Sequence, residues 1–561
     1  MRMVLERGER RLLLIELVYP LLLLAMGVYG GLMQTLMRAG IVQRDPFLGP
    51  NYYQGLTLHG VFNAIVFTTF FAVAFGNALV PYALGKRLPM RWAWVSALLM
   101  VVGSLMAAIT IFAGGASVLY TFYPPLKAHP AFYLGLVLLV VGSWVAFFNW
   151  IPLYRHWRRE NPASKTPLAV VGIFATFIVW LIATAAVAVE ILFLLLPWSL
   201  GWTQEVNVML ARTLFWFFGH PLVYFWLLPA YVMYYTMLPR LAGGKLYSDA
   251  AGRLVFMLFI IFSIPVGTHH QYMDPAIGSN WKLLHAFFTF AVALPSLITA
   301  FTVAASLEYA GRLRGARGLF DWLWKQPYFS REQWLFSYLM AGLIIFIFGG
   351  ISGIINASYS MNVAVHNTSW IPGHFHMTVA GPVLLAFLGM SLYLIAQVAG
   401  KEVRFRGLAV AAPWTWLVGL LLFSFAMSRG GLLGMPRRTN LGVTYLNPSS
   451  PFFREEWVLW ADLAVVGGVI MTLAIVLYLL TFLGTLLSRQ ATEPALAFPL
   501  AEAYHDEPVR ALANFRPWIV AALILIAIAY TPVIWDVLRS TYENAPPYLP
   551  SSPLPVQPAG Q

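Results

Sequence analysis

The sequence predicts an all-α, polytopic membrane protein with about thirteen transmembrane helices. Of its 561 residues, 60% are hydrophobic and only 10% are charged, whereas soluble domains are nearer one half apolar and one quarter charged. The mean hydropathy is +0.73. Apolar runs long enough to cross a bilayer recur along the chain, which excludes an ordinary soluble fold.

The predicted helices follow one another with short polar or basic connections. In chain order, the thirteen apolar runs are centred on residues 11–37, 58–84, 92–114, 131–153, 167–196, 207–238, 251–271, 283–309, 333–357, 374–398, 408–428, 458–485 and 515–537. The first run lacks a small-residue cleavage site, so we expect a retained helix rather than a signal peptide.

The net charge of +13 comes from basic residues whose placement predicts how the chain is oriented in a membrane. Most of the 35 Lys and Arg residues fall in connections on the side of the N-terminus, and basic connections stay in the cytoplasm. We therefore expect the plasma membrane of a prokaryote, with the N-terminus cytoplasmic and the C-terminus outside. The partner of this charge is then the lipid bilayer, and no nucleic-acid partner is expected.

The domain organisation is predicted to be simple, because neither an internal repeat nor a soluble domain is evident. Residues 1–540 are expected to form a single integral-membrane domain, with a polar inside loop at about 486–514. Residues 541–561 are proline-rich and are expected to form an extended tail on the outer side.

Histidines are the most informative polar residues, since most of the eleven lie in or beside predicted spans. Ionisable groups in spans are costly and are functional candidates. His374 and His376 are two positions apart, so on a helix they point to opposite sides. Any one of these histidines could equally well be a structural residue, neutral and bonded to a backbone carbonyl. The pair is better explained by two different binding partners, one on each side of the helix.

A second group of histidines has the composition of a metal site. His220 and Tyr224 lie one turn apart on one helix face. His269 and His270 are adjacent, and a proline and a glycine just before them are expected to distort the helix so that both rings face one ion. Three neutral imidazoles suit copper, zinc or iron.

One further histidine, His59, makes a second kind of pairing possible. His59 opens the second run, and the predicted topology places it near the outer face of the membrane, as it does His374 and His376. A bis-histidine heme between the second and tenth runs is therefore geometrically possible.

Four motifs in this order carry a family resemblance: LHG at 58–60, GHPLVY at 219–224, HH at 269–270 and HFH at 374–376. Together they resemble the catalytic subunit of heme–copper oxygen reductases over nearly all spans. The resemblance implies a terminal oxidase that reduces dioxygen to water, takes up protons and translocates them across the membrane. It implies roles for six histidines: low-spin heme iron, His59 and His376; high-spin heme iron, His374; copper B, His220, His269 and His270.

The same resemblance implies a catalytic tyrosine and a heme-propionate region. In this family, the tyrosine at the place of Tyr224 is joined covalently to the copper-ligating histidine and supplies an electron and a proton. Arg437 and Arg438 lie on the predicted outer side against the charge rule, so an anionic partner such as heme propionates is expected. His366 and Arg212 are further candidates for that region.

Departures from the commonest branch point to the B branch of the family. Leu222 replaces the glutamate of the GHPxVY motif. Asn77, Pro81 and Gly85 keep the pattern that precedes an acidic residue, but Leu88 stands in place of that acid, so that proton pathway is expected to be absent. The loop YTFYPPL at 120–126 also resembles the B branch. A single proton pathway is expected through six polar residues: Tyr231, Tyr235, Ser248, Ser296, Thr299 and Thr302.

Two other functions remain as alternatives. A nitric oxide reductase shares the six histidines but uses non-heme iron, carries glutamates near the metal and lacks the tyrosine. A transporter with structural histidines has a similar number of spans, but no inverted repeat or broken helix pair is recognised. Asn362 stands where close B-branch relatives carry aspartate, which leaves the pumping stoichiometry open.

The cofactors and partners follow from the resemblance and from the absence of cysteine. A low-spin heme of b type, a high-spin heme of a or b type and one copper ion are expected, with dioxygen and protons as substrates. Without thiolates the chain cannot build a dinuclear copper centre. An outer-face subunit with dinuclear copper or a c-type heme is therefore expected to deliver electrons from cytochrome c, or alternatively from quinol.

Overall fold

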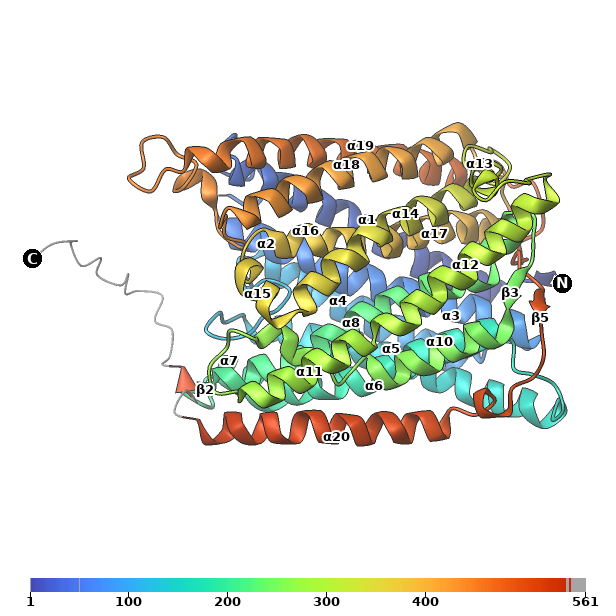
Figure 1. Cartoon of the computed structure of the whole chain (residues 1–561), viewed down its shortest axis with the longest axis horizontal. Coiled ribbons are helices and arrows are strands. Elements are labelled where there is room, and N and C mark those ends of the chain that lie inside the picture. Colours follow the sequence, from blue (N-terminus) through green and yellow to red (C-terminus); the bar gives the residue numbers. More distant parts are fainter. Residues whose placement is uncertain (1, 50, 541–543, 546–561) are drawn as a thin grey trace, which may run out of the picture.

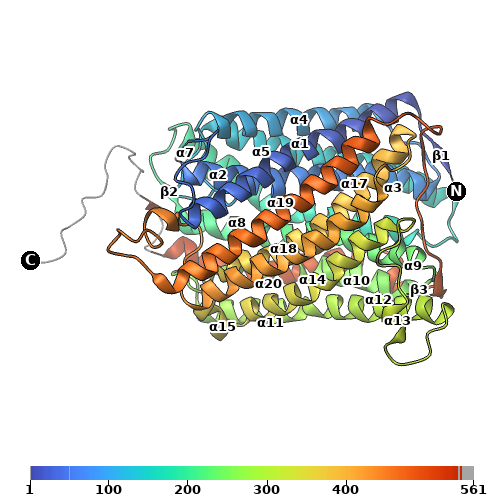
Figure 2. The same cartoon turned by 90° about the horizontal axis from the view of Figure 1, so that it is seen from above.

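The computed structural model describes residues 2–49, 51–540 and 544–545. Its long helices run roughly along one axis and pack side by side, as both views show (Figure 1, Figure 2). Twelve helices within the described residues are long and apolar enough to cross a membrane. The predicted all-α membrane fold is confirmed.

Seven of these spans are single helices. Their bounds are α1 (Arg7–Arg38), α4 (Met90–Phe112), α5 (Pro130–Glu160), α8 (Val208–Thr236), α14 (Trp334–Ala357), α18 (Arg406–Leu432) and α20 (Arg516–Arg539). An eighth, α19 (Val458–Leu486), is preceded by the short turn η6 (Glu455–Trp457). These helices match predicted runs, with ends that shift by several residues because polar turns extend them beyond the apolar core.

The remaining four spans change their winding along their length. Three contain a π-helical stretch: α2 (Tyr52–Gly60), η1 (Val61–Phe67) and α3 (Thr68–Leu84); α6 (Leu168–Val189), η2 (Glu190–Leu195) and α7 (Leu196–Ser199); α16 (Trp370–Phe375), η4 (His376–Val383) and α17 (Leu384–Ala399). The fourth joins α11 (Ser279–Ala291) to α12 (Ala293–Leu313). π-Helical turns are rare and gather at functional sites, and two of these three adjoin His59 and His376.

The seventh predicted run, 251–271, is not among these twelve spans and is not one continuous helix. α10 (Asp249–Phe262) ends before Pro265, and a 3-10 turn, η3 (Gly267–Gln271), follows. Proline cannot continue the helical hydrogen bonds. Gly267 fits where it does because an added Cβ would lie 2.2 Å from the Trp216 carbonyl oxygen. The distortion predicted before the histidine pair is therefore present.

Short elements mark the two ends of the bundle. At one end, β1 (Met3–Val4) pairs antiparallel with β4 (Ala495–Leu496), and β3 (Leu246–Ser248) pairs parallel with β5 (Ala503–His505). These strands lie with α13 (Asp321–Trp324) at the right of Figure 1. Most of the polar loop 486–514, which includes η7 (Arg510–Leu512), is thus held at the N-terminal end.

The opposite end carries the other connections. β2 (Val206–Asn207) pairs antiparallel with β6 (Asn544–Ala545). The α15 helix (Tyr359–Val365) also lies at this end (Figure 1). Two further short elements connect spans: η5 (Leu441–Val443), and α9 (Leu238–Leu241), which lies beside β3 at the N-terminal end (Figure 2). Apart from Asn544–Ala545, the predicted proline-rich tail at 541–561 lies outside the described residues.

One extended hydrophobic core runs through the bundle, from Leu12 in α1 to Ala522 in α20. The residues that keep the pattern of the absent proton pathway lie in or beside this core. Asn77 and Pro81 lie inside α3, and Gly85 ends the helix with φ of +62°. Asn77 is therefore a helical residue, in agreement with the predicted run at 58–84.

Candidate functional site

One internal cavity of about 680 Å³ collects the histidines singled out from the sequence. It lies among α1, α2, α8, α14, η3 and η4. Segments far apart in the chain, such as α1 and η4, therefore meet around it. All six histidines predicted to hold metals line this cavity: His59, His220, His269, His270, His374 and His376.

His59 and His376 form a matched pair. Their ring centroids are 6.1 Å apart and their planes differ by 11°. Nδ1 of His59 lies 2.8 Å from the Gly27 carbonyl oxygen, and Nδ1 of His376 lies 2.7 Å from that of Pro372. A carbonyl only accepts, so Nδ1 is the donor in both rings and Nε2 keeps a lone pair for a metal.

Glycines in α1 allow this approach. A Cβ at Gly31 would lie 2.6 Å from Nδ1 of His59, and one at Gly27 would lie 2.1 Å from Oδ1 of Asn63. Both positions therefore need glycine, which lets the α1 backbone reach the His59 ring as a hydrogen-bond acceptor.

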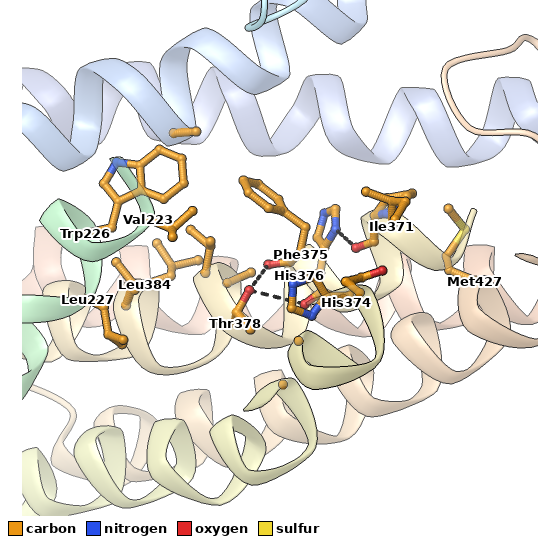
Figure 3. Close-up of a pocket in the computed structure, with 18 of the residues that line it drawn as sticks. Val223, Trp226, Leu227, Ile371, His374, Phe375, His376, Thr378, Leu384 and Met427 are labelled. Carbon is orange, nitrogen blue, oxygen red and sulfur yellow. Dashed lines mark hydrogen bonds between the residues drawn. The ribbon is translucent and has the colours of Figure 1, made fainter. Parts of the chain in front are cut away.

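His374 faces the other way. Its Nδ1 lies 2.9 Å from the Ser352 hydroxyl, which itself donates to the Gly349 carbonyl. Because that hydroxyl proton is used, Nδ1 of His374 donates and Nε2 is again left for a metal. Figure 3 shows the rings of His374 and His376 leaving their helix on opposite sides. The two rings therefore point in different directions, as helical periodicity predicts.

His220, His269 and His270 form a compact group whose ligand atoms lie within 4.8 Å of one another. The His220 and His269 ring centroids are 4.4 Å apart, and those of His269 and His270 are 4.1 Å apart. The break after α10 makes this possible, since adjacent residues of a regular helix diverge by about 100°.

Neighbouring side chains orient the group. Nδ1 of His269 lies 3.0 Å from the Thr289 hydroxyl, which donates to the His285 carbonyl, so Nε2 of His269 points away from Thr289. His270 stacks on Trp216 at a centroid distance of 3.9 Å. Nε2 of His220 has no hydrogen-bond partner among the described residues although it is buried. A metal ligand would be left in this state when its metal is removed.

Tyr224 lies where the sequence spacing places it, one turn along α8 from His220. The two ring centroids are 4.9 Å apart with planes at 63°. Tyr224 is buried and lines the same cavity.

Arg437 and Arg438 form the positive wall of the cavity. Arg438 donates to the Tyr123 hydroxyl at 2.8 Å, and Arg437 donates to Oδ1 of Asn367 at 2.9 Å. Nε of Arg437 is buried and unpaired within the described chain. Burial and the neighbouring Arg438 lower the pKa of Arg437 to about 10. Two half-buried cations side by side call for an anion, and carboxylates fit the guanidinium fork.

Tyr123 shows how strong this positive field is. Burial would raise the pKa of this tyrosine, but the charges of Arg438, Arg212 and Arg437 lower it to about 7. The Arg212 guanidinium lies 4.5 Å from the Tyr123 ring centroid. Arg212 itself binds both carboxylate oxygens of Asp274, at 2.9 and 2.8 Å. Arg212 therefore contacts Tyr123, the residue that Arg438 also binds.

His366 and Asn362 also line the cavity. Nδ1 of His366 lies 3.0 Å from Oδ1 of Asn362, and Nδ2 of Asn362 donates to the Asn356 carbonyl at 2.8 Å. The amide thus has a fixed orientation and accepts from the imidazole, as a carboxylate at this position would.

Four of the six predicted proton-pathway residues meet in pairs. Tyr231 donates to Ser296 at 3.0 Å, and Tyr235 donates to Thr299 at 2.9 Å. Tyr231, Ser296 and Thr299 line the cavity together with Tyr224. The other two lie apart. Thr302 donates to the Ile298 carbonyl, and Ser248 caps the start of α10 by accepting from the Ala251 amide.

Sequence reasoning missed several residues that shape this site. Ser352 and Thr289 orient histidines, Trp216 stacks on one, and the buried Arg38 donates to the carbonyls of Thr439 and Pro436 beside the arginine wall. Polar residues inside apolar runs were the available signal for Ser352 and Thr289. His285 is structural: its Nε2 donates to the Ala529 carbonyl at 3.0 Å.

Comparison with known proteins identifies the family. Residues 14–470 match the family described as Cytochrome C and Quinol oxidase polypeptide I. This chain belongs to that family. Cytochrome c oxidase subunit 1 of Thermus thermophilus is 41% identical over 548 residues, which cover 94% of each chain. The subunit 1 of Thermostichus vulcanus is 27% identical over 432 residues, covering 73% of this chain and 74% of the relative.

A solved structure agrees over the whole fold. The cryo-EM structure of a heme-copper terminal oxidase dimer has a TM-score of 0.95 and 52% sequence identity, covering 98% of this chain and 97% of that chain. The predicted recognition, enzyme class and cofactors are confirmed: the chain is an oxidoreductase subunit of a bacterial terminal oxidase, in a family that carries two hemes and a copper ion.

The residues present fit those cofactors. The cavity is lined largely by apolar groups, its six histidines carry acceptor nitrogens, and a half-buried pair of arginines stands at one wall. The described lining contains neither Asp nor Glu. A neutral imidazole set without carboxylates suits copper better than a harder ion.

Proposed function

We propose that His59 and His376 hold the low-spin heme, that His374 binds the high-spin heme, and that His220, His269 and His270 hold copper. The observation that carries this assignment is the shared cavity. In it, Nδ1 of His59, His376, His374 and His269 contacts an acceptor while Nε2 remains available. Acceptors of this kind, which take the proton of the other ring nitrogen, orient metal-bound histidines in proteins.

The hemes and copper would supply electron storage and dioxygen binding, and the chain's own residues handle protons and charge. Tyr224 lies beside His220, so its phenol is placed to give a proton and an electron to dioxygen chemistry at the triad. Arg437 and Arg438 would bind heme propionates, with His366 at the edge of the same region and Arg212 behind it.

Protons would reach Tyr224 through the hydroxyl pairs between α8 and α12. Protons would pass first through the pair of Tyr235 and Thr299. They would then pass through the pair of Tyr231 and Ser296, both of which line the cavity. Thr302 lies one turn beyond Thr299 on α12, and Ser248 lies beside the N-terminal end of the bundle. They would extend the route, with water joining the hydroxyl pairs. Translocation of further protons would accompany this uptake.

The membrane arrangement follows from charge. The basic connections gather at the end that holds β1, β3 and β5, so we propose that this end faces the cytoplasm of a prokaryotic cell. Residues 1–540 would then act as one integral-membrane domain. Electrons would enter at the opposite end from a subunit with dinuclear copper or a c-type heme, with cytochrome c as donor and quinol as the alternative.

Metal analysis of the purified complex tests this assignment. We expect two hemes in a pyridine hemochrome spectrum and one copper per chain, with dioxygen consumption that follows reduced cytochrome c. Non-heme iron in place of copper would favour the nitric oxide reductase alternative. A chain free of heme would favour a transporter.

A further inference from the structure

Two carboxyl groups are completely buried inside membrane-spanning segments, away from the histidine cavity: Glu16 of α1 and Glu190 of η2, both with 0% exposure. Their surroundings differ. Both Glu190 oxygens lack a hydrogen-bond partner among the described residues. Both Glu16 oxygens accept from Nδ2 of Asn77, at 2.9 and 3.1 Å. Ionisable groups in spans are functional candidates by default.

The amide beside Glu16 is held in one orientation. Oδ1 of Asn77 accepts from the Trp150 indole at 2.9 Å, so Nδ2 must face Glu16. Trp150 reaches this place because Gly76 leaves room: an added Cβ would lie 2.1 Å from the indole ring. Glu16, Asn77 and Trp150 thus form a buried polar chain across α1, α3 and α5.

A small cavity connects this chain toward the N-terminal end of the bundle. It measures about 10 Å³, close to the space that one water molecule needs. Its lining residues are Met3, Leu5, Glu9, Leu13, Asn77, Pro81, Leu88 and Leu496. Glu9 lies two turns before Glu16 on the same face of α1. Its carboxylate pairs with Arg87 at 2.7 Å near the surface.

The contacts of Glu16 leave its charge unbalanced. Asn77 is a neutral donor, and the described structure gives Glu16 no salt bridge. An ionised carboxylate without a countercharge is costly in an apolar interior. A proton would balance that charge, and the one-water cavity is lined both by Asn77, the partner of Glu16, and by the Glu9 carboxylate.

We propose that Glu16 is a proton-binding site, filled from the N-terminal end through Glu9 and the small cavity, and separate from the hydroxyl pairs of α8 and α12. The Glu9 carboxylate first takes up a proton from the aqueous phase and releases it to the water in the small cavity, and that water passes a proton to a Glu16 oxygen beside Asn77. Glu9 returns to the carboxylate that pairs with Arg87, so protons and charge are balanced at every step.

Infrared spectroscopy of the purified complex tests the site. We expect Glu16→Gln to remove one carboxylic C=O band, and that band to shift in the wild-type complex after transfer to D₂O. Glu190→Gln is the matched control. It should remove a different band, at higher frequency because its carboxyl is free of hydrogen bonds, and that band should exchange severalfold more slowly.

The supply route has its own test. Glu9→Gln should slow the D₂O exchange of the Glu16 band severalfold and leave the Glu190 band unchanged. Equal exchange with and without the Glu9 carboxyl would overturn the route, and a Glu16→Gln spectrum that keeps every carboxylic band would overturn the site. If Glu16→Gln does not assemble, Asn77→Leu should raise the frequency of the Glu16 band, and an unmoved band would contradict the assignment.

Turnover separates this site from the oxygen chemistry. Because Glu16 lies outside the histidine cavity, Glu16→Gln should keep dioxygen consumption within about twofold of wild type, the range expected when no essential proton carrier is lost. Near-complete loss of turnover with intact heme spectra would place Glu16 on the main proton route and overturn its separateness.

Discussion

The two sides of the cavity are built by different means. On the side of His59 and His376, the helices are continuous and the partners of the rings are backbone carbonyls of Gly27 and Pro372. On the side of the triad and His374, a helix is broken and the partners are the hydroxyls of Thr289 and Ser352. One side is therefore oriented by the backbone itself, whereas the other depends on side chains that a single substitution can remove.

The largest expected effect comes from removing a histidine that is proposed to bind the low-spin heme. His59→Ala or His376→Ala should abolish the low-spin heme signal and leave the high-spin signal, because each removes one of two axial nitrogens. Optical spectra of the purified complex measure both. Equal loss of both signals in a folded complex would contradict the assignment.

The triad provides the matching experiment on the other side. Replacing His220, His269 or His270 by alanine should lower the copper content while both hemes remain, since these three rings form a group of their own, separate from the His59–His376 pair. Metal analysis alongside the heme spectrum measures this. A heme deficit that equals the copper deficit would count against two separate sites.

Tyr224→Phe keeps the ring volume and removes the hydroxyl. Dioxygen turnover should fall by about 10²-fold or more, the scale of a lost catalytic proton donor, with normal metal content. Mass spectrometry of the wild-type chain should also show a crosslinked peptide that contains His220 and Tyr224. Turnover like that of wild type would reopen the nitric oxide reductase alternative.

Thr289→Val sharpens the contrast between the two sides. Loss of the hydroxyl that orients His269 should weaken copper binding by about 10–100-fold, the usual cost of removing such a partner. The low-spin heme spectrum should not change. Thr302→Val is the matched control, since Thr302 also donates to its own helix but lies outside the cavity lining. Equal copper loss in both variants would show a general packing defect.

Thr299→Val is expected to leave the heme and copper site unchanged and to slow the delivery of protons. It removes the acceptor of the Tyr235 hydroxyl and should slow steady-state turnover severalfold without altering heme spectra. Asn77→Ala should leave proton uptake for turnover largely intact, although it removes the only donor that the described structure gives Glu16. Blocked uptake in the Asn77 variant with normal uptake in the Thr299 variant would contradict the single-pathway proposal.

Regular helices explain which site features the sequence could predict. His374 and His376 point to opposite sides, and His220 and Tyr224 share a face, because helical periodicity fixes these directions. The meeting of His269 and His270 with His220 was predictable only as a distortion near Pro265. Its form, a helix that ends at Phe262 and a 3-10 turn packed against Trp216, depends on α8.

The predicted proton pathway shows the limit of periodicity. Thr302 shares a stripe with Ser296 and Thr299 on α12. Its hydroxyl donates to the Ile298 carbonyl of its own helix, whereas Ser296 and Thr299 accept from tyrosines of α8. Spacing along one helix says which residues share a face, but contact depends on how a second helix crosses it.

By itself, the sequence determined the all-α membrane fold, the number of apolar runs, the six histidines and the tyrosine, because bilayer thickness and helical periodicity are local constraints that composition and spacing record. Only the tertiary structure decided which hydroxyls and carbonyls hold each ring, that Arg38 joins Arg437 and Arg438, and that Asn77 binds a buried Glu16. Apart from the local contact between His376 and Pro372, those contacts join residues 20 to 401 positions apart, and their geometry exists only once the helices have packed.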